Sequence, residues 1–249
     1  MATCSADCAL LLDAIAGYDD NDSASVKVGP PEAYLSLTEN LDGLRVGYVV
    51  NFSEFPAVSD TMQQATGKAM AVLRDLGAEI TDVELPDLWD FTICNSTIMM
   101  AEAYAIHEQR LQNQAADYTE STRARISLGA LISATDYIDA QKMRRELALA
   151  VKTVLYSVDV LVYPGMLDEP PIATEIHPFY FLKSPLITAP ANVGGIPTAS
   201  VCCGFSEEGL PQAIQISGRW FEDATVLRVA HAYERAVGFS SRLPPGVEE

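Results

Sequence analysis

The segment from residue 44 to residue 85 constrains the fold more than any other part of the sequence. Residues 44–50 are apolar and partly β-branched and lie between turn signals, so they predict a strand. Residues 59–76 carry their apolar side chains on one helical stripe, and residues 79–85 alternate as a half-solvated strand does. A strand–helix–strand unit of this length implies a parallel pair joined by a right-handed crossover. The chain therefore predicts an α/β fold.

The remaining apolar patterns predict a mixed β-sheet flanked by helices. Further strands are expected at 158–163, 198–205 and 212–217, and helices at 6–16, within 88–156 and at 222–237. Breaks in the long helical region are expected near 118–121 and 129–133, and a long loop with three prolines at 168–181. No internal repeat or linker is visible in the sequence, so residues 1–249 are expected to form a single domain.

The acidic surplus excludes some classes of partner. The chain has 34 acidic and 16 basic residues and a net charge of −18. A negative field of this size repels phosphate backbones and anionic lipid, so we expect neither nucleic acid nor a membrane as a partner. No apolar run reaches the ~18 residues of a membrane span, and the first residues lack a basic segment followed by a signal-peptide core. We therefore expect a cytoplasmic protein.

Local motifs for catalysis are missing from the sequence. It contains no Gly-x-Ser-x-Gly elbow, no phosphate-binding glycine loop and no Cys-x-x-Cys pair. Five cysteines fit neither a disulfide framework nor a zinc spacing: Cys4, Cys8, Cys94, Cys202 and Cys203. We expect free thiols, no metal and no cofactor.

Three histidines and one acidic pair are the remaining candidates for chemistry. His107 lies on an expected helix without a second ligand, and His231 lies beside an apolar stripe, so both are expected to pack or to face solvent. His177 lies in the proline-rich loop, where it could reach the mouth of a pocket. Asp168 and Glu169 could serve as general acid and base, but two adjacent acids in a loop are more often solvated. From motifs alone the chain is a soluble α/β domain of unknown activity.

Three stretches of the sequence carry a family resemblance. They are residues 158–164 with 181–205, which contain LITAPANVGGIP, residues 209–227, which begin GLPQAIQISGR, and residues 6–17, ADCALLLDAIAG. Together they resemble the C-terminal half of the amidase-signature hydrolases, which cleave carboxamide bonds. The likeness extends over essentially the whole chain and implies that family's mixed sheet flanked by helices.

The resemblance also implies how the complete enzyme works. A serine nucleophile, a bridging cis serine and a lysine base attack the amide, while backbone amides hold the oxyanion. In that family all of these groups belong to the N-terminal half, and residues 1–5 resemble the turn just beyond it. The resemblance therefore implies no catalytic residue in this chain, no hydrolysis by the chain alone, and a small-molecule amide as the substrate of the complete enzyme.

One segment resembles the wall of the family's substrate pocket. Residues 184–192 match the segment that lines the acyl side of the site in relatives. Its candidate substrate-binding residues are Pro185, Thr188, Ala189 and Asn192. Pro185 cannot form the ion pair by which the related polypeptides of glutamyl-tRNA amidotransferases hold an amino group, so that role is disfavoured. The alternative is ordinary packing, because small residues beside Gly194 and Gly195 allow close backbone approach with or without a ligand.

Three interpretations of the whole chain follow. The first is a truncated or split amidase, completed by an N-terminal fragment or associated as a homodimer. The second is a non-catalytic binding or assembly protein that uses an exposed sheet as an interface, because loss of half the fold should uncover apolar surface. The third is that Met1 is an internal methionine of a longer gene.

Overall fold

The computed structural model describes residues 1–177, 179, 182–239 and 242 of the chain, which divides into two units. Unit 1 consists of Met1–Glu84, Thr153–Glu169 and Ile196–Glu249. Unit 2 consists of Leu85–Lys152 and Pro170–Gly195. This division does not test whether the two units fold together, so the single domain of residues 1–249 stays a prediction.

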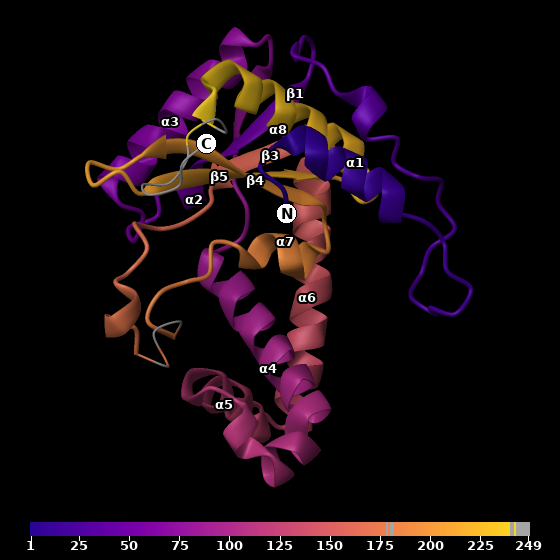
Figure 1. The fold of residues 1–249 in the computed structure, drawn as a ribbon, viewed down its shortest axis with the longest axis vertical. Helices are drawn as coiled ribbons and strands as arrows, with labels where there is room; N and C mark the ends of the chain where they lie inside the picture. The colour runs from indigo at the N-terminus through magenta and orange to yellow at the C-terminus, as the bar shows by residue number, and fades with distance from the viewer. Residues whose placement is uncertain (178, 180–181, 240–241, 243–249) are drawn as a thin grey trace. The chain divides into compact units, whose positions relative to one another are not determined.

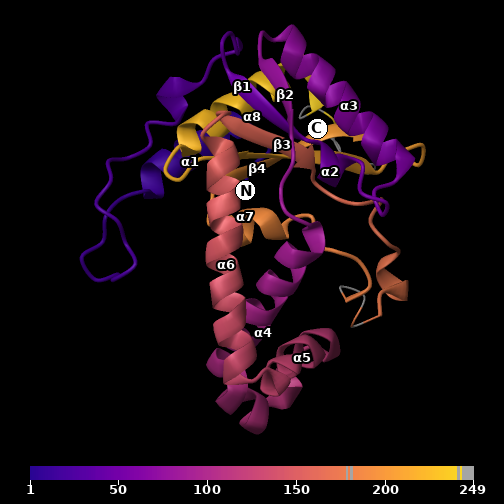
Figure 2. The same ribbon diagram turned by 180° about the vertical axis from the view of Figure 1, so that it is seen from behind.

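Unit 1 is built on a five-stranded mixed sheet with the strand order β2-β1-β3-β5-β4; Figure 1 labels β1, β3, β4 and β5, and Figure 2 labels β2. The strands are β1 (Arg45–Val49), β2 (Glu79–Val83), β3 (Val160–Pro164), β4 (Thr198–Phe205) and β5 (Pro211–Gly218). β1 lies parallel to both β2 and β3, whereas β5 lies antiparallel to β3 and β4. The predicted α/β class, the mixed sheet and the parallel pair of residues 44–85 are confirmed.

Helices α3 and α8 cover one face of this sheet. The helical elements of unit 1 are α1 (Ser5–Ile15), η1 (Tyr34–Ser36), α2 (Val50–Ser53), α3 (Asp60–Asp75) and α8 (Asp223–Val237). α3 and α8 contact each other and both contact β4 and β5, and α1 packs on α8, as both views show (Figures 1 and 2). Ile214 and Ile216 of β5 are fully buried in this layer.

Helix α3 illustrates how the sequence builds this layer. The Ser59 hydroxyl accepts a hydrogen bond from the Met62 amide at 3.4 Å and so caps the helix N-terminus. Met62, Ala69 and Leu73 lie on one stripe and are fully buried. Burying a Leu or Met side chain contributes about 1.5–3 kcal/mol, so this stripe rather than helix propensity fixes α3 on the sheet.

Unit 2 is helical. Its elements are α4 (Leu88–Asn113), η2 (Ala115–Asp117), α5 (Glu120–Ser127), η3 (Leu128–Leu131), α6 (Ala134–Leu155, whose last turn enters unit 1), η4 (Ala173–Glu175) and α7 (Ala189–Gly194). The breaks predicted near 118–121 and 129–133 are confirmed, because Thr119 caps α5 and residues 132–133 separate η3 from α6. The predicted loop at 168–181 contains η4, and its residues 178, 180 and 181 lie outside the described part.

Gly129 allows η3 to approach α4 closely. A Cβ atom at this position would lie 2.1 Å from the Met100 carbonyl oxygen and 2.5 Å from the Tyr104 Cβ. Neither contact is sterically possible, so only glycine fits between the two elements.

Within the described residues, no helix is both long and apolar enough to cross a membrane. The cytoplasmic location stays a prediction.

Candidate functional site

The predicted pocket-wall residues all lie in unit 2, on α7 and the loop before it. Pro185 is buried, and the amide of the next residue, Leu186, donates a hydrogen bond to the Thr92 hydroxyl of α4 at 2.8 Å. Ala189 begins α7 and is fully buried. The buried Pro185 and Ala189 therefore hold the segment in place.

Thr188 and Asn192 are exposed and come to the same side of α7, because residues four apart are neighbours on a helix surface. The Thr188 side chain makes no capping hydrogen bond. The helix itself is anchored by the Arg144 guanidinium, which donates to the Val193 carbonyl at 3.3 Å, and it ends at Gly195 with φ +63°. The structure thus separates the four candidates into two that pack and two that face outward. Their role in substrate binding stays a prediction.

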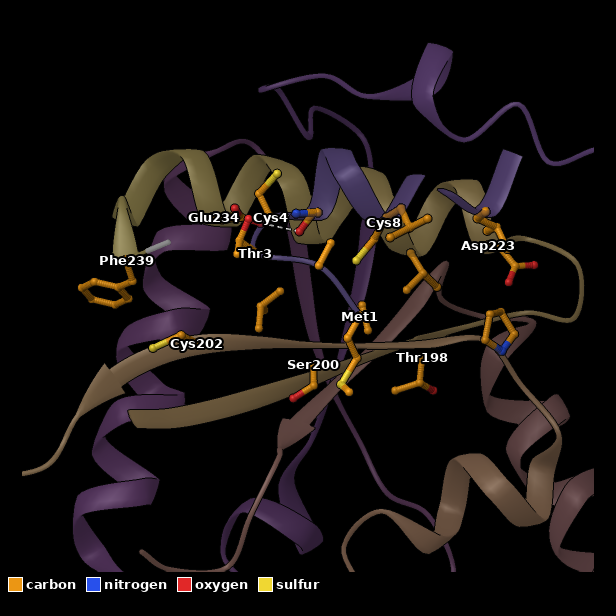
Figure 3. Close-up of a pocket in the computed structure, with 18 of the residues that line it drawn as sticks. Met1, Thr3, Cys4, Cys8, Thr198, Ser200, Cys202, Asp223, Glu234 and Phe239 are labelled. Carbon is orange, nitrogen blue, oxygen red and sulfur yellow. Dashed lines mark hydrogen bonds between the residues drawn. The ribbon is translucent and has the colours of Figure 1, made fainter. Parts of the chain in front are cut away.

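A cavity of about 730 Å³ lies in unit 1, bounded by the first residues of the chain, α1, β4 and α8. Figure 3 shows Cys4, Cys8 and Cys202 around it. Its apolar lining includes Val201, Val226, Leu227 and Val237. None of the four predicted pocket-wall residues lines this cavity.

One carboxylate joins α1 to α8 at the edge of the cavity. Glu234 Oε2 accepts a hydrogen bond from the Ser5 amide at 2.7 Å and another from the Ser5 hydroxyl at 2.5 Å (Figure 3). Cys4, at the N-cap of α1, provides no side-chain cap. Glu234 therefore pairs with the Ser5 amide, which has no partner within α1, although the two residues are 229 positions apart in the sequence.

A group of hydroxyls centred on the buried Ser217 lies on the sheet. Ser217 of β5 is fully buried, and its Oγ is 3.0 Å from the Tyr163 hydroxyl and 2.8 Å from the Thr198 hydroxyl. Burial raises the pKa of Tyr163 to about 12, so the phenol stays protonated at neutral pH and cannot take a proton from Ser217. The neighbouring Gln215 is buried, and its Nε2 has no hydrogen-bond partner among the described residues. These groups order the sheet and do not form an activated nucleophile.

Each of the histidine and acidic candidates has its own local surroundings. His107 Nδ1 lies 2.9 Å from the Tyr118 hydroxyl, with the two rings in an edge-to-face arrangement in unit 2. His177 Nδ1 accepts the Phe179 amide in a local turn, and His231 is half-buried on α8. Asp168 is exposed and Glu169 half-buried in the loop after β3.

All five cysteines are free thiols. Cys94 and Cys203 are buried, and burial raises the pKa of the Cys94 thiol and that of the Cys203 thiol, the latter to about 12. Cys4, Cys8 and Cys202 are half-buried. Within the part of the chain that the structure describes, no group of three or more His, Cys, Asp or Glu side chains could hold a metal ion.

Two features of unit 1 were not predicted from the sequence: the cavity and the hydroxyl group around Ser217. Alternation along the last two strands could have indicated the second, because Thr198, Gln215 and Ser217 occupy positions that share one face of an antiparallel pair. The cavity had no such signal, since α1, β4 and α8 meet only in three dimensions.

Comparison with known proteins decides the family. The Amidase family profile matches residues 1–227. The chain belongs to the Amidase family. A Pseudomonas putida amidase is 33% identical over 246 residues, which cover 96% of this chain and 52% of the relative. A glutamyl-tRNA(Gln) amidotransferase polypeptide from Chloroflexus aurantiacus is 34% identical over 273 residues, covering 98% of this chain and 55% of the relative.

Solved amidase structures share the fold. A bacterial aryl acylamidase of the amidase-signature family superposes with a TM-score of 0.77 and 26% identity, covering 95% of this chain and 52% of that one. The chain thus spans about half the length of the curated amidase relatives it matches. The predicted amidase-signature resemblance is confirmed.

Proposed function

We propose that this chain is the C-terminal half of an amidase, and that it supplies scaffold and substrate-pocket wall to an enzyme that hydrolyses the carbon–nitrogen bond of a small carboxamide. The observation that carries the proposal is the Amidase family match over residues 1–227. The chain covers only 52% and 55% of the length of two curated relatives. Under this proposal the chain forms one half of the fold, and the remainder of the enzyme supplies the chemistry.

The surroundings of two buried serines support inactivity of the isolated chain. Within the part of the chain that the structure describes, the Ser217 hydroxyl contacts only other hydroxyls, and the Ser5 hydroxyl donates to the Glu234 carboxylate. Neither serine contacts an amine or imidazole base there that could activate it. Loss of nucleophile and base together costs about 10⁶-fold in rate. We therefore expect no measurable amide hydrolysis by the chain alone.

The exposed pair on α7 supports the pocket-wall role. Thr188 and Asn192 present a hydroxyl and an amide to solvent from a helix that is anchored on α4 and α6. Such groups can bind a carbonyl oxygen or an amide N–H of a substrate. Pro185 and Ala189 would position them without touching solvent. Because Pro185 carries no charge to hold an amino group, we assign the chain to small carboxamides rather than to aminoacyl-tRNA.

The first test measures ammonia released from a panel of simple carboxamides by the purified chain. We expect a rate equal to that of buffer. Turnover that is abolished by Ser217→Ala would overturn the proposal, because it would locate a working nucleophile in this chain.

The second test uses a chimera in which this chain replaces the matched segment of the Pseudomonas putida amidase. We expect the chimera to release ammonia, and Thr188→Val or Asn192→Ala to lower its kcat/KM about 3- to 10-fold, the effect of one lost hydrogen bond. The matched control is Thr174→Val, another exposed threonine of unit 2 that lies outside the pocket-wall segment. Equal effects at positions 174 and 188 would contradict the pocket-wall assignment.

A second candidate function is a non-catalytic binding or assembly protein. The uncharged outer edge of β4 beside the 730 Å³ cavity favours it, because such an edge can pair with another chain. The chimera separates the two candidates. A folded chimera without ammonia release would favour assembly, and hydrolysis by the chimera would favour the amidase half.

A further inference from the structure

Thr92 connects α4 to the pocket-wall segment, residues 184–192, through one buried hydroxyl. Its side chain lies near the start of α4 and is 5% exposed. The Thr92 hydroxyl donates a hydrogen bond to the Leu88 carbonyl, one turn earlier in the same helix, at 2.8 Å. It also accepts a hydrogen bond from the Leu186 amide at 2.8 Å, across 94 positions of the sequence. The hydroxyl therefore uses its donor and an acceptor site at once.

The Leu186 amide belongs to a tight turn that carries Thr188. The Leu186 carbonyl accepts a hydrogen bond from the Ala189 amide at 2.9 Å, three residues later, and this bond closes the turn. Thr188 occupies the third position with φ −86° and ψ −12°, the values typical of a type I turn. The turn leads directly into α7, and Thr92 holds its first residue. The position of the Thr92 hydroxyl therefore sets the position of the turn.

Helix α7 needs such an external support. It has six residues, and its N-cap side chain makes no hydrogen bond to it. A helix this short is not stable on its own in water, so contacts with the rest of unit 2 must fix it. At its end the Arg144 guanidinium donates to the Val193 carbonyl at 3.3 Å, but Arg144 is exposed. The bond to Thr92 is shorter and better shielded from water, which makes it the stronger constraint.

Apolar packing alone does not fix where Thr188 points. α4 and α7 contact each other and lie side by side in both views (Figures 1 and 2). Ile187 and Ala189, which flank Thr188, are buried. The burial of apolar side chains is not directional, so it holds the segment against α4 without selecting one position along that helix. A hydrogen bond requires a defined distance and angle, so the bond to Thr92 selects that position.

The bond from Thr92 to its own helix is not the unusual feature. Thr66 of α3 is fully buried and donates to the Met62 carbonyl in the same way, at 2.9 Å. Such bonds within a helix are common for threonine. Thr92 differs because it also accepts the amide that precedes the exposed part of the pocket-wall segment.

We propose that Thr92 is a positioning residue of the amidase half. Its hydroxyl fixes the turn before α7 and so holds Thr188 and Asn192 in the orientation that binds the carboxamide of a substrate. This rests on the proposed function. Because Thr92 is buried, it acts through these two exposed side chains.

The decisive variants are Thr92→Val and its conservative partner Thr92→Ser. Valine has nearly the shape of threonine but no hydroxyl, so the Leu186 amide loses its acceptor. Serine keeps the hydroxyl and loses only a methyl group. The matched control is Thr66→Val, which removes the same bond within a helix from unit 1. Circular dichroism checks the folding of each variant, and Thr92→Ala replaces Thr92→Val if valine prevents folding.

Hydrogen exchange of the chain alone measures whether Thr92 holds the turn. We expect the amides of residues 186–194 to exchange about 10-fold faster in Thr92→Val than in the wild type, the effect of one lost hydrogen bond on local opening. Thr92→Ser and Thr66→Val should exchange like the wild type in this segment. Equal exchange of the segment in Thr92→Val and Thr66→Val overturns the proposal.

The chimera with the Pseudomonas putida amidase measures whether the turn matters for the substrate. We expect Thr92→Val to raise KM about 3- to 10-fold with kcat nearly unchanged, because substrate binding is weakened, and Thr92→Ser to restore KM. The loss should largely vanish when Thr92→Val is added to the double variant Thr188→Val, Asn192→Ala, since residues that act through one another are not additive. Additive losses, or a loss in kcat alone, overturn the positioning role.

The chimera also separates this proposal from the proposed function. An inactive chimera overturns the proposed function, and the positioning role falls with it. An active chimera in which Thr92→Val behaves like Thr66→Val overturns the positioning role alone.

Discussion

Asp159 joins three parts of unit 1 through one carboxylate. It accepts hydrogen bonds from the Arg45 guanidinium at 2.7 Å and from the Arg219 guanidinium at 2.9 Å. Arg45 begins β1, Asp159 directly precedes β3, and Arg219 directly follows β5. Burial would raise the pKa of Asp159, but the hydrogen bonds from the two arginines outweigh it and lower the pKa from 3.8 to about 2. The charged form therefore stabilises the fold by about 2 kcal/mol.

This residue gives a pH-dependent prediction. Because the folded pKa lies below the unfolded value, the stabilisation is present above pH 3.8 and is lost as the pH falls through about 2. Asp159→Asn should lower the free energy of unfolding by about 2 kcal/mol at neutral pH, and the difference from the wild type should shrink across that window. Urea unfolding at several pH values measures it. The control is Asp139→Asn, whose exposed pair with Lys142 should contribute little. A difference that is constant with pH would contradict the assignment.

The sequence predicted single residues best where one local rule applied. The cap of α3 at Ser59 and the end of α8 at Gly238 depend on neighbours only a few residues away, so local rules account for both. The partners of Asp159 and Ser217 could not be predicted in this way, because Arg219 and Tyr163 lie 60 and 54 residues distant.

At the scale of elements, strong apolar periodicity was sufficient to predict a helix or strand and its approximate bounds. α3, α8 and the strands were predicted within a few residues of their bounds, because each carries one buried face. α2 and α7 were missed because helices of four and six residues are too short to show a period. The signals for α7 were Pro190 in its first turn and Gly195 just past its end. The sheet order depends on contacts distant in sequence and carried no local signal.

The contact between α1 and α8 gives a second prediction. α1 lacks a cap of its own, and Glu234 on α8 accepts both the amide and the hydroxyl of Ser5. Glu234→Ala should lower the opening free energy of α1 by about 1–3 kcal/mol, because it leaves part-buried donors without a partner. Hydrogen exchange should then accelerate in residues 5–15 and stay unchanged in β1. The control is Glu39→Ala, which removes an exposed ion pair with Arg235, a neighbour of Glu234 on α8. Equal acceleration by both variants would contradict the capping role.

At the scale of the whole molecule, the family could be predicted from the sequence, but the arrangement of the candidate site could not. The Amidase family could be predicted from residues spread over the chain, and the matched region of 1–227 confirms it. The sequence did not predict which of the four pocket-wall candidates are buried, because this depends on the formation of α7 and its packing. The four are Pro185, Thr188, Ala189 and Asn192. Half the length of the curated relatives is unmatched, so under the proposed function the groups that complete the site belong to polypeptide beyond the matched half.

Linkage between folding and binding gives the last prediction. A partner that binds only the folded chain raises its free energy of unfolding by about 2.7 kcal/mol when the free partner is at 100 times its Kd. The unmatched portion of the Pseudomonas putida amidase should therefore shift the urea midpoint of this chain upward with concentration. A midpoint that does not move with the added polypeptide would contradict the proposal that the folded chain completes an amidase together with it.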